Sequence, residues 1–337
     1  MRTVDIHSHL LNPNVRFDRL YDKLTIKFFA KKLGVDPAQL QSDPYNTFVS
    51  SMAENISQSK YLESTCIFGV DSRLDKQGKE IDRDKTVCAM TSDVLDVAAR
   101  HPQAFIPFMS INPRRANALD LIDEYVAQGC QGAKFLQNYW GVDLNDACFI
   151  PYYEKLKHHN LPLIIHIGSE YSIDSDSRYE RANMLRLPLE TGVTVIAAHM
   201  GLGRINHKLC FWRNLSKNPK YFDEDYYSLL EMLQQHDNLY ADISAILVPL
   251  RARALRHLSH QAKVHNKLLF GTDYPVPYTI RFNTHDLPSA ESRHIDSISN
   301  PFDRYTEAIL AYFPEESPLY TNHRKVLINL GNTQNNA

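Results

Sequence analysis

Short apolar runs recur along the whole chain, and segments with helical periodicity separate them. Runs of β-branched and aliphatic residues bounded by polar or turn residues are typical of strands. Eight strands are predicted, at Thr3–His9, Ser64–Val70, Phe105–Ile111, Gln131–Leu136, Leu161–Ile167, Thr194–His199, Leu239–Ile243 and Lys267–Thr272. Because most of these runs are apolar on both faces, we expect the strands to be buried in a parallel sheet.

Helical patterns lie between the strands. Apolar residues recur at i, i+3 and i+4 spacing in 87–99, 116–127, 227–233 and 248–258. Eight strands that alternate with helices predict an α/β fold of the (β/α)8 TIM-barrel type, distorted by insertions, in a single domain over 1–337. An open doubly wound sheet is the alternative, but its first turn is usually rich in glycine, and here residues 8–13 contain none.

Two segments are longer than ordinary barrel connections. Phe17–Gln58 follows the first strand, with helical patterns at Leu20–Leu33 and Asn46–Ser59, and Gly201–Tyr226 follows the sixth strand. Long loops at this face of a barrel usually cover the active site, although they could instead pad the surface or mediate contacts between subunits. A C-terminal extension over about 301–330 is predicted to be helical at Arg304–Phe313 and His323–Leu330, with a frayed end at Asn332–Ala337.

Composition excludes several classes of partner. The 337 residues are 43% hydrophobic, which is enough for a large core, and 37 basic against 39 acidic residues give a net charge of -2. This balance gives no electrostatic reason to bind nucleic acid or a membrane surface, and no apolar run is long enough to span a bilayer. The five dispersed cysteines indicate reduced thiols. We expect a cytoplasmic protein with a small-molecule substrate, and a homodimer is left open.

Metal-binding side chains stand at the ends of several predicted strands. His7 and His9 are two residues apart on the first strand and therefore point to the same side. His166 ends the fifth strand and Asp273 follows the eighth. Because all strand ends of a barrel meet at one face, these four residues are expected to bind a divalent metal. Three imidazoles and one carboxylate suit Zn²⁺, with Mn or Fe as alternatives, and such an ion activates a bound water.

Two further residues have more than one interpretation. His199, at the end of the sixth strand, could bind metal or act as a free general acid or base. Lys134, in the fourth strand, faces the same mouth, so a nearby metal should lower its pKa. A neutral Lys134 could form a carbamate that bridges two ions, whereas a cationic one could bind a substrate carboxylate or be purely structural. The sequence therefore leaves one or two ions open.

Substrate contacts are predicted on the loops beyond the strands. Tyr139 and Trp140 follow the fourth strand and could form an aromatic wall. Arg178, Arg181 and Arg204 lie on loops after the fifth and sixth strands, where a guanidinium could form a bidentate pair with a carboxylate. Each of these residues could instead be an ordinary surface or packing residue.

Five motifs occur in an order that resembles the amidohydrolase superfamily. They are Asp5-Ile6-His7-Ser8-His9, Gly132-Ala133-Lys134, Ile165-His166, Ala198-His199-Met200-Gly201 and Phe270-Gly271-Thr272-Asp273-Tyr274-Pro275. They look closest to the amidohydrolase 2 branch, which is related to aminocarboxymuconate-semialdehyde decarboxylase. The resemblance implies a metal-dependent TIM-barrel enzyme with ligands His7, His9 and His166, and with Asp273 as both ligand and proton shuttle. It places His199 and Lys134 where two-metal members bind a second ion.

The branch contains hydrolases, lactonases, hydratases and decarboxylases of carboxylated substrates. We predict a hydrolase that acts on an ester, lactone or amide of a small carboxylated molecule, with Asp273 and His199 as catalytic residues. The alternative is a metal-dependent decarboxylase of an unsaturated or aromatic acid. A non-catalytic metal-binding barrel is a third interpretation, which the presence of Asp273 argues against.

Overall fold

A computed structural model of the chain describes residues 1–14, 30, 33–81, 88–170, 173–203, 222–249, 251–280 and 287–330. Each of the eight predicted strands overlaps an observed one, although most of the observed strands are shorter than predicted and β2 begins two residues earlier. The eight are β1 (Thr3–His9), β2 (Leu62–Phe68), β5 (Phe105–Pro107), β6 (Ala133–Phe135), β7 (Leu163–Ile165), β8 (Val195–Ala197), β9 (Leu239–Asp242) and β10 (Leu268–Leu269). A small antiparallel hairpin, β3 (Arg73–Leu74) and β4 (Glu80–Ile81), lies outside this set and was not predicted.

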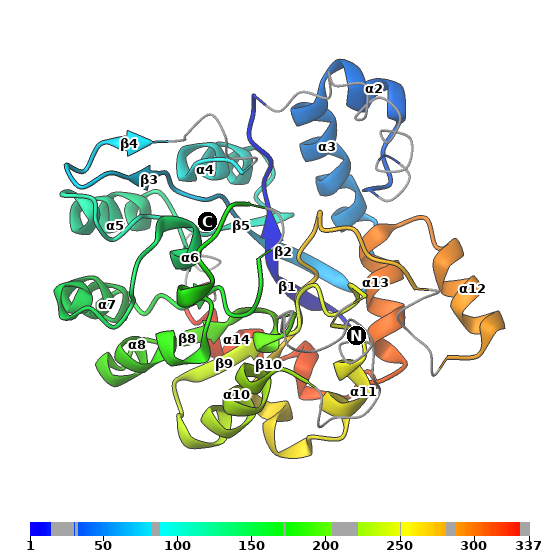
Figure 1. The fold of residues 1–337 in the computed structure, drawn as a ribbon. Helices are drawn as coiled ribbons and strands as arrows, with labels where there is room; N and C mark the ends of the chain where they lie inside the picture. The colour runs from blue at the N-terminus through cyan, green and yellow to red at the C-terminus, as the bar shows by residue number, and fades with distance from the viewer. Residues whose placement is uncertain are drawn as a thin grey trace.

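The eight strands close into a parallel barrel (Figure 1). Two sheets, β1-β2-β5 and β10-β9-β8-β7-β6, contain only parallel neighbours. One junction between them is a bridge from Met109 to Ala133. At the other, Ser8 bridges to Tyr274, and the amide of Asp273 donates to the carbonyl of His7 at 2.8 Å. These two junctions confirm the predicted TIM barrel and exclude the open sheet.

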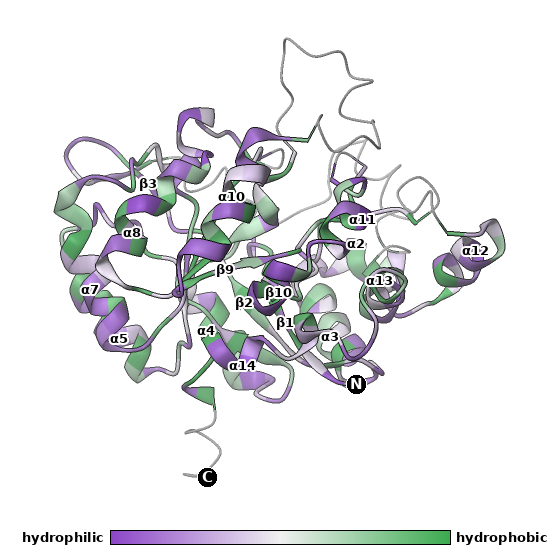
Figure 2. Cartoon of the chain, turned by 90° about the horizontal axis from the view of Figure 1, so that it is seen from below, coloured by the Kyte–Doolittle hydropathy of each residue, from purple (hydrophilic) through white to green (hydrophobic). Residues whose placement is uncertain are grey.

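Helices surround the strands on the outside of the barrel. They are α2 (Pro37–Ser42), α3 (Pro44–Ser57), α4 (Thr91–Arg100), α5 (Ala118–Ala127), α6 (Gln137–Trp140), α7 (Ile150–His158), α8 (Arg186–Thr191), α10 (Glu224–Gln235), α11 (Ala254–Ser259), α12 (Ser289–Ser297), α13 (Pro301–Leu310) and α14 (His323–Val326). Figure 2 shows hydrophilic and hydrophobic residues along the same helices, as expected of helices with one face on the barrel. No helix within the described ranges combines the length and the hydropathy needed to cross a bilayer.

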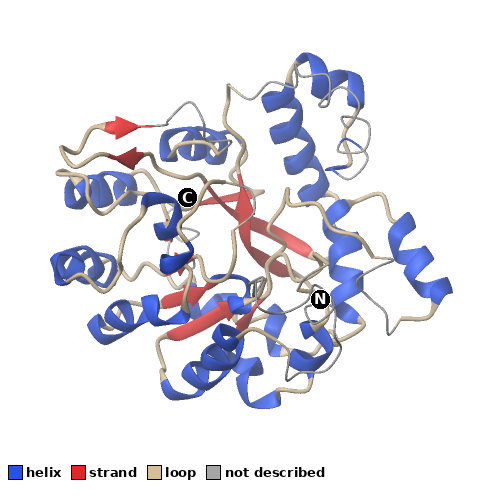
Figure 3. Cartoon of the chain, viewed as in Figure 1, coloured by secondary structure: helices blue, strands red, loops and turns tan. Residues whose placement is uncertain are grey.

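The insertion and the C-terminal extension lie on the same side of the barrel (Figure 3). The α3 helix falls within the insertion and is capped by Asp43, whose carboxylate accepts from the amide of Asn46 at 3.3 Å. The side-chain amide of Asn300, which caps α13, donates to the carbonyl of Asn55 at 2.6 Å. The predicted helices near 46–59 and 304–313 are therefore present. Of the other predictions, most of Leu20–Leu33 and Gly201–Tyr226 and all of Asn332–Ala337 lie outside the described residues.

The interior of the barrel is filled by side chains from alternate strand positions. Val4, Ile6 and Phe68 belong to this cluster, together with residues of β5, β7, β8 and β10. Val326 and Leu327 join the same cluster from the extension. The extension therefore closes the N-terminal end of the barrel, and the opposite end is left for the site.

Candidate active site

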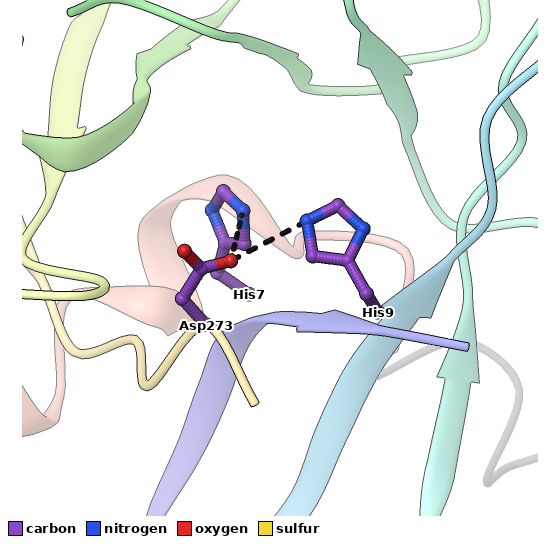
Figure 4. Close-up of side chains that lie close together, drawn as sticks. All are labelled: His7, His9 and Asp273. Atoms are coloured by element: carbon purple, nitrogen blue, oxygen red, sulfur yellow. Dashed lines mark ion pairs between the residues drawn. The ribbon is translucent and has the colours of Figure 1, made fainter. Parts of the chain in front are cut away.

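Three side chains from the first and last strands meet at the C-terminal end of the barrel (Figure 4). The Nε2 atom of His7 lies 3.4 Å from Asp273 Oδ1, and that of His9 lies 3.3 Å from the same oxygen. Asp273 follows β10 with a positive φ of 65°, and its amide is fixed by the backbone bond to His7. Gly271 permits this approach, because a Cβ there would lie 3.2 Å from the Cβ atoms of His7 and Ser244.

A buried carboxylate, Asp5, ties the two strands together behind the site. It accepts from the amide of His7 at 3.0 Å and from Ser8 Oγ at 3.1 Å on its own strand. Across the junction it accepts from Thr272, through the amide at 3.0 Å and the hydroxyl at 2.6 Å. Burial raises the pKa of Asp5 to about 6, against these hydrogen bonds. Asp5 therefore sets the position of His7 relative to Asp273.

A second buried carboxylate, Asp242, holds the other nitrogen of His7. Asp242 Oδ2 lies 2.8 Å from His7 Nδ1, and both side chains are fully buried. Asp242 also accepts from the amides of His199 and Ser244, each at 3.0 Å. Because a carboxylate can only accept here, Nδ1 of His7 carries the hydrogen, and the Nε2 lone pair faces Asp273. Asp242 was not predicted from the sequence, although an acidic residue near the end of an apolar strand is a usable signal.

The remaining two histidines line the same mouth. The ring of His199 lies 4.9 Å from the rings of both His7 and His166, between centroids. His199 Nδ1 is 2.8 Å from Ser244 Oγ and 3.8 Å from Asp273 Oδ2. The Nε2 atom of His166 lies 3.0 Å from the carbonyl of Gly168. His166 is therefore beside the His7, His9 and Asp273 set without being part of its closest contacts.

Lys134 ends inside the barrel next to His7. Its side chain is fully buried, with Nζ 3.4 Å from His7 Nε2 and 5.2 Å from the ring centroid of Phe68. Burial lowers the pKa of Lys134 to about 8, although Asp242 and Asp273 oppose the shift. The carbamate and the substrate-binding interpretations of this residue both stay predictions.

The protonation states favour a cation at this position. Burial lowers the pKa of His199 well below its usual value and that of His166 to about 4. Burial by itself raises the pKa of Asp273, but His7 and His9 outweigh it and hold the pKa at about 2. For His9, burial alone lowers the pKa, whereas Asp273 and Cys88 raise it to about 9. An incoming metal ion would therefore displace a proton from His9.

A divalent ion fits the atoms that are present. Asp273 Oδ1 is buried and has no hydrogen-bond partner among the described residues, yet two imidazole Nε2 atoms face it. His7, His9 and Asp273 each offer one ligand atom within 4.8 Å of the others, and so do His7, His199 and Asp242. Nitrogen and carboxylate ligands of this kind suit zinc and related ions. The first set could hold a metal with His166 beside it.

A cavity of about 560 Å³ opens above these residues. His9, His166, His199 and Asp273 lie at its base, and Glu170 and Arg251 line it as well. Much of the rest is apolar, including Leu10, Leu11, Val70, Leu136 and Val248. Arg251 was missed in the sequence analysis, because an arginine in the segment after the seventh strand resembles an ordinary surface residue.

The predicted aromatic contacts pack away from this cavity. The indole Nε1 of Trp140 donates to the carbonyl of Asp71 at 2.8 Å, and the side chain is buried. Tyr139 is also buried, with the guanidinium of Arg73 4.7 Å from its ring centroid. Neither residue is among those that line the cavity.

None of the arginines predicted to contact the substrate is found in the cavity wall: two lie elsewhere, and the third is outside the described residues. Arg178 is exposed, and its Nε lies 2.9 Å from Asp176 Oδ1. Arg181 pairs with Asp225 at 2.8 Å. Arg204 lies outside the described residues. Of the arginines in the described part of the chain, the cavity is lined by Arg251 instead.

Comparison with known proteins identifies the family. The family model described as Amidohydrolase matches residues 4–281. The chain belongs to the amidohydrolase family. This confirms the resemblance inferred from the five motifs, and it makes the protein a member of an enzyme family. No curated protein matches the chain.

Several solved structures have a fold similar to that of this amidohydrolase, at low sequence identity. An uncharacterized TIM-barrel protein from Bordetella bronchiseptica has a TM-score of 0.59 and 17% identity, over 98% of this chain and 100% of that one. An amidohydrolase from Burkholderia multivorans with bound zinc has a TM-score of 0.54 and 13% identity, over 97% and 99%. A probable 2-pyrone-4,6-dicarboxylic acid hydrolase from Acinetobacter baumannii, with citric acid bound, has a TM-score of 0.52 and 14% identity, over 97% and 99%. These matches support the barrel fold.

Proposed function

We propose that this amidohydrolase is a metal-dependent hydrolase of an ester, lactone or amide bond in a small carboxylated molecule. The observation that carries the proposal is the buried Asp273 Oδ1, which lacks a hydrogen-bond partner among the described residues and faces the Nε2 atoms of His7 and His9. A buried carboxylate is costly unless a positive charge accompanies it, and a divalent ion can replace the proton that His9 otherwise holds beside Asp273. We further propose zinc as the ion, because imidazole nitrogens supply most of the ligands.

Each side chain of the site would have a distinct role in binding the ion or in moving a proton. His7, His9 and Asp273 would hold the ion, with His166 beside them. When bound, a divalent ion polarises a carbonyl oxygen and makes water a better nucleophile. Asp273 Oδ2 points toward His199 at 3.8 Å and is the carboxylate placed to accept a proton and pass it to a leaving group.

His199 would act on the substrate rather than on water. Burial and the nearby cation Arg251 lower the pKa of His199, so the ring is neutral at pH 7. The Oγ of Ser244, 2.8 Å from Nδ1, fixes the orientation of the ring. Because the Ser244 hydroxyl donates to Asp242, Nδ1 of His199 carries the hydrogen, and the Nε2 lone pair of the neutral ring can accept a hydrogen bond or a proton from a substrate hydroxyl.

A product assay with the metal-loaded protein tests the reaction. The Zn²⁺- and Mn²⁺-loaded chain would be given carboxylated lactones, esters and amides together with unsaturated and aromatic acids. We expect metal-dependent appearance of the hydrolysis product without carbon dioxide. Carbon dioxide release without hydrolysis products would overturn the hydrolase and favour the decarboxylase. Bound metal with no turnover of any compound would favour a non-catalytic barrel.

Metal stoichiometry separates the two interpretations of Lys134. Two ions per chain, lost in Lys134→Ala and restored by short carboxylic acids, would support a carbamate that bridges the ions. One ion per chain, unchanged in that variant, would exclude it. The buried position of Nζ, 3.4 Å from His7 Nε2, makes the substitution informative in either case.

A further inference from the structure

A buried guanidinium that forms no ion pair with any described residue lines the cavity. Arg251 is only 5% exposed. One of its terminal nitrogens donates to the carbonyl of Ser169 at 3.1 Å, and its Nε is buried with no hydrogen-bond partner among the described residues. Arginine has five N–H donors and stays charged at all ordinary pH values. Most of this donor capacity is therefore not used by the part of the chain that the structure describes.

No carboxylate of the described residues forms an ion pair with this cation, although the charge of Arg251 contributes to the low pKa of Asp273. Glu170 lines the same cavity, but its carboxylate lies 3.7 Å from His166 Nδ1. Asp273 faces His7 and His9 at the base. A buried charge is costly unless it is paired, so Arg251, which has no ion-pair partner among the described residues, indicates that an anion from outside completes this cavity.

The rest of the wall indicates what carries the anion. Val248 and Pro249 precede Arg251 along the chain and line the cavity with it, and Leu10, Leu11 and Leu136 line it as well. Apolar surfaces of this kind bind hydrocarbon and exclude water from the charged pair. A strongly hydrated polyanion would gain nothing from such a wall.

We propose that Arg251 binds the carboxylate of the substrate, and that the substrate is a carboxylic acid with a mainly apolar body whose scissile bond lies over His9, Asp273 and His199. The fork of a guanidinium matches a carboxylate in a bidentate pair, and a lysine does not reproduce it. The position of the scissile bond rests on the proposed function, whereas the carboxylate site does not.

Binding of acids and their amides tests the proposal without relying on turnover. Benzoate, 4-hydroxybenzoate and hexanoate would each be compared with its primary amide by calorimetry on the full chain, once with Zn²⁺ and once after chelation. We expect at least one acid to bind roughly ten-fold more tightly than its amide, in both metal states. In Arg251→Gln the preference should fall at least about ten-fold, because the charge is lost while an N–H donor for Ser169 is kept.

Matched variants keep the result interpretable. Arg253→Gln removes a charge from the same turn but from a residue that does not line the cavity, and it should bind like the wild type. Arg251→Lys keeps the charge without the fork and should lose part of the preference. If Arg251→Gln does not fold, the lysine variant carries the test, and undiminished acid binding in it would overturn the proposal.

The remaining outcomes separate this proposal from the hydrolase. No preference for any acid, or a preference that survives in Arg251→Gln, would overturn the carboxylate site. A preference that appears only with Zn²⁺ and is unchanged in the variant would mean that the metal holds the carboxylate. An Arg251-dependent preference without any hydrolysis would support the site while the proposed reaction fails.

Discussion

His7 is held from both ends of its ring. Asp242 accepts a hydrogen bond from Nδ1 at 2.8 Å, and Nε2 lies 3.4 Å from the Asp273 carboxylate. A carboxylate behind a ligand histidine fixes the tautomer and makes the free nitrogen more basic. The strength of metal binding should therefore depend on a residue that does not itself touch the ion.

For Asp242→Asn we expect metal affinity to fall about 10- to 100-fold, because the amide no longer enforces one tautomer of His7. Competition with a chromophoric chelator measures this directly. Asp237→Asn, just before the same strand at its other end, is the matched control and should keep the wild-type affinity. Equal affinities in the two variants would contradict the positioning role.

Asp273→Asn tests the proton transfer. Asparagine retains an oxygen ligand but cannot accept a proton, so we expect a folded protein whose turnover at saturating metal falls at least ~100-fold. Metal content and the melting temperature should be measured in parallel. Turnover within a few-fold of the wild type would contradict the proposed role of Asp273.

At the scale of residues, the sequence predicted the groups whose place depends only on strand ends. His7, His9, His199 and Asp273 come together because they end parallel strands of one barrel. Arg251 was missed because its place depends on the path of a loop, which no periodicity reveals. Trp140 was assigned to the substrate for the same reason, whereas its indole is used in the core.

At the scale of elements, existence was easier to predict than extent. The helix predicted at 248–258 begins only at residue 254, because Ala245 takes a positive φ of 50° and turns occupy the residues that follow it. The β3–β4 hairpin was missed, since its strands are too short to show alternation. Local hydrogen bonds rather than hydrophobic patterning decide such boundaries.

Gly168, in the loop after β7, packs closely against the loop after β8, and its replacement should lower the free energy of unfolding. Its φ is +101°, and a Cβ would lie 2.4 Å from the carbonyl oxygen of Leu202, in the loop after β8. For Gly168→Ala we expect a loss of about 2 to 4 kcal/mol in the free energy of unfolding, measured by denaturant titration.

Gly129→Ala separates backbone conformation from crowding. Gly129 has nearly the same φ, +102°, but nothing lies within 4 Å of the added Cβ. We expect a loss of only about 1 kcal/mol in this variant, from the left-handed backbone alone. Equal losses at the two glycines would show that the contact with Leu202 has no energetic weight.

At the scale of the whole molecule, buried histidines make stability depend on pH. His323, on α14, is 5% exposed, and burial lowers its pKa to about 4 from 6.5. The unfolded chain therefore binds more protons between these two values, and the folded state loses stability as pH falls from 6.5 toward 4. At pH 5 the loss from this one residue is on the order of 1 to 2 kcal/mol.

In His323→Gln the fall in stability between pH 7 and pH 5 should be smaller by that amount. Urea titrations of the chelator-treated protein at the two pH values measure it. His158→Gln, at an exposed position at the end of α7, should leave the pH dependence as it is in the wild type. An unchanged slope in the His323 variant would contradict the assignment.

The barrel could be predicted from the sequence, but the hydrogen bonds that close it could not. Counting eight strands indicates a closed cylinder, but the bonds between Asp5 and Thr272, 267 positions apart, leave no local pattern. The role of the C-terminal extension was also hidden, because Val326 and Leu327 reveal their place only once the strands are assembled.

The hydrogen bonds between Asp5 and Thr272 join the first and last strands of the barrel, which affects when the site can form during synthesis. During translation, His7 and His9 precede their carboxylate partner, Asp273, by 266 and 264 residues. If the proposed metal site is correct, the nascent protein could not hold an ion between these three residues until almost all of the barrel has been synthesised. Metal binding would then occur late in maturation. A chain released from the ribosome before Asp273 is translated would have His7 and His9 without their carboxylate partner.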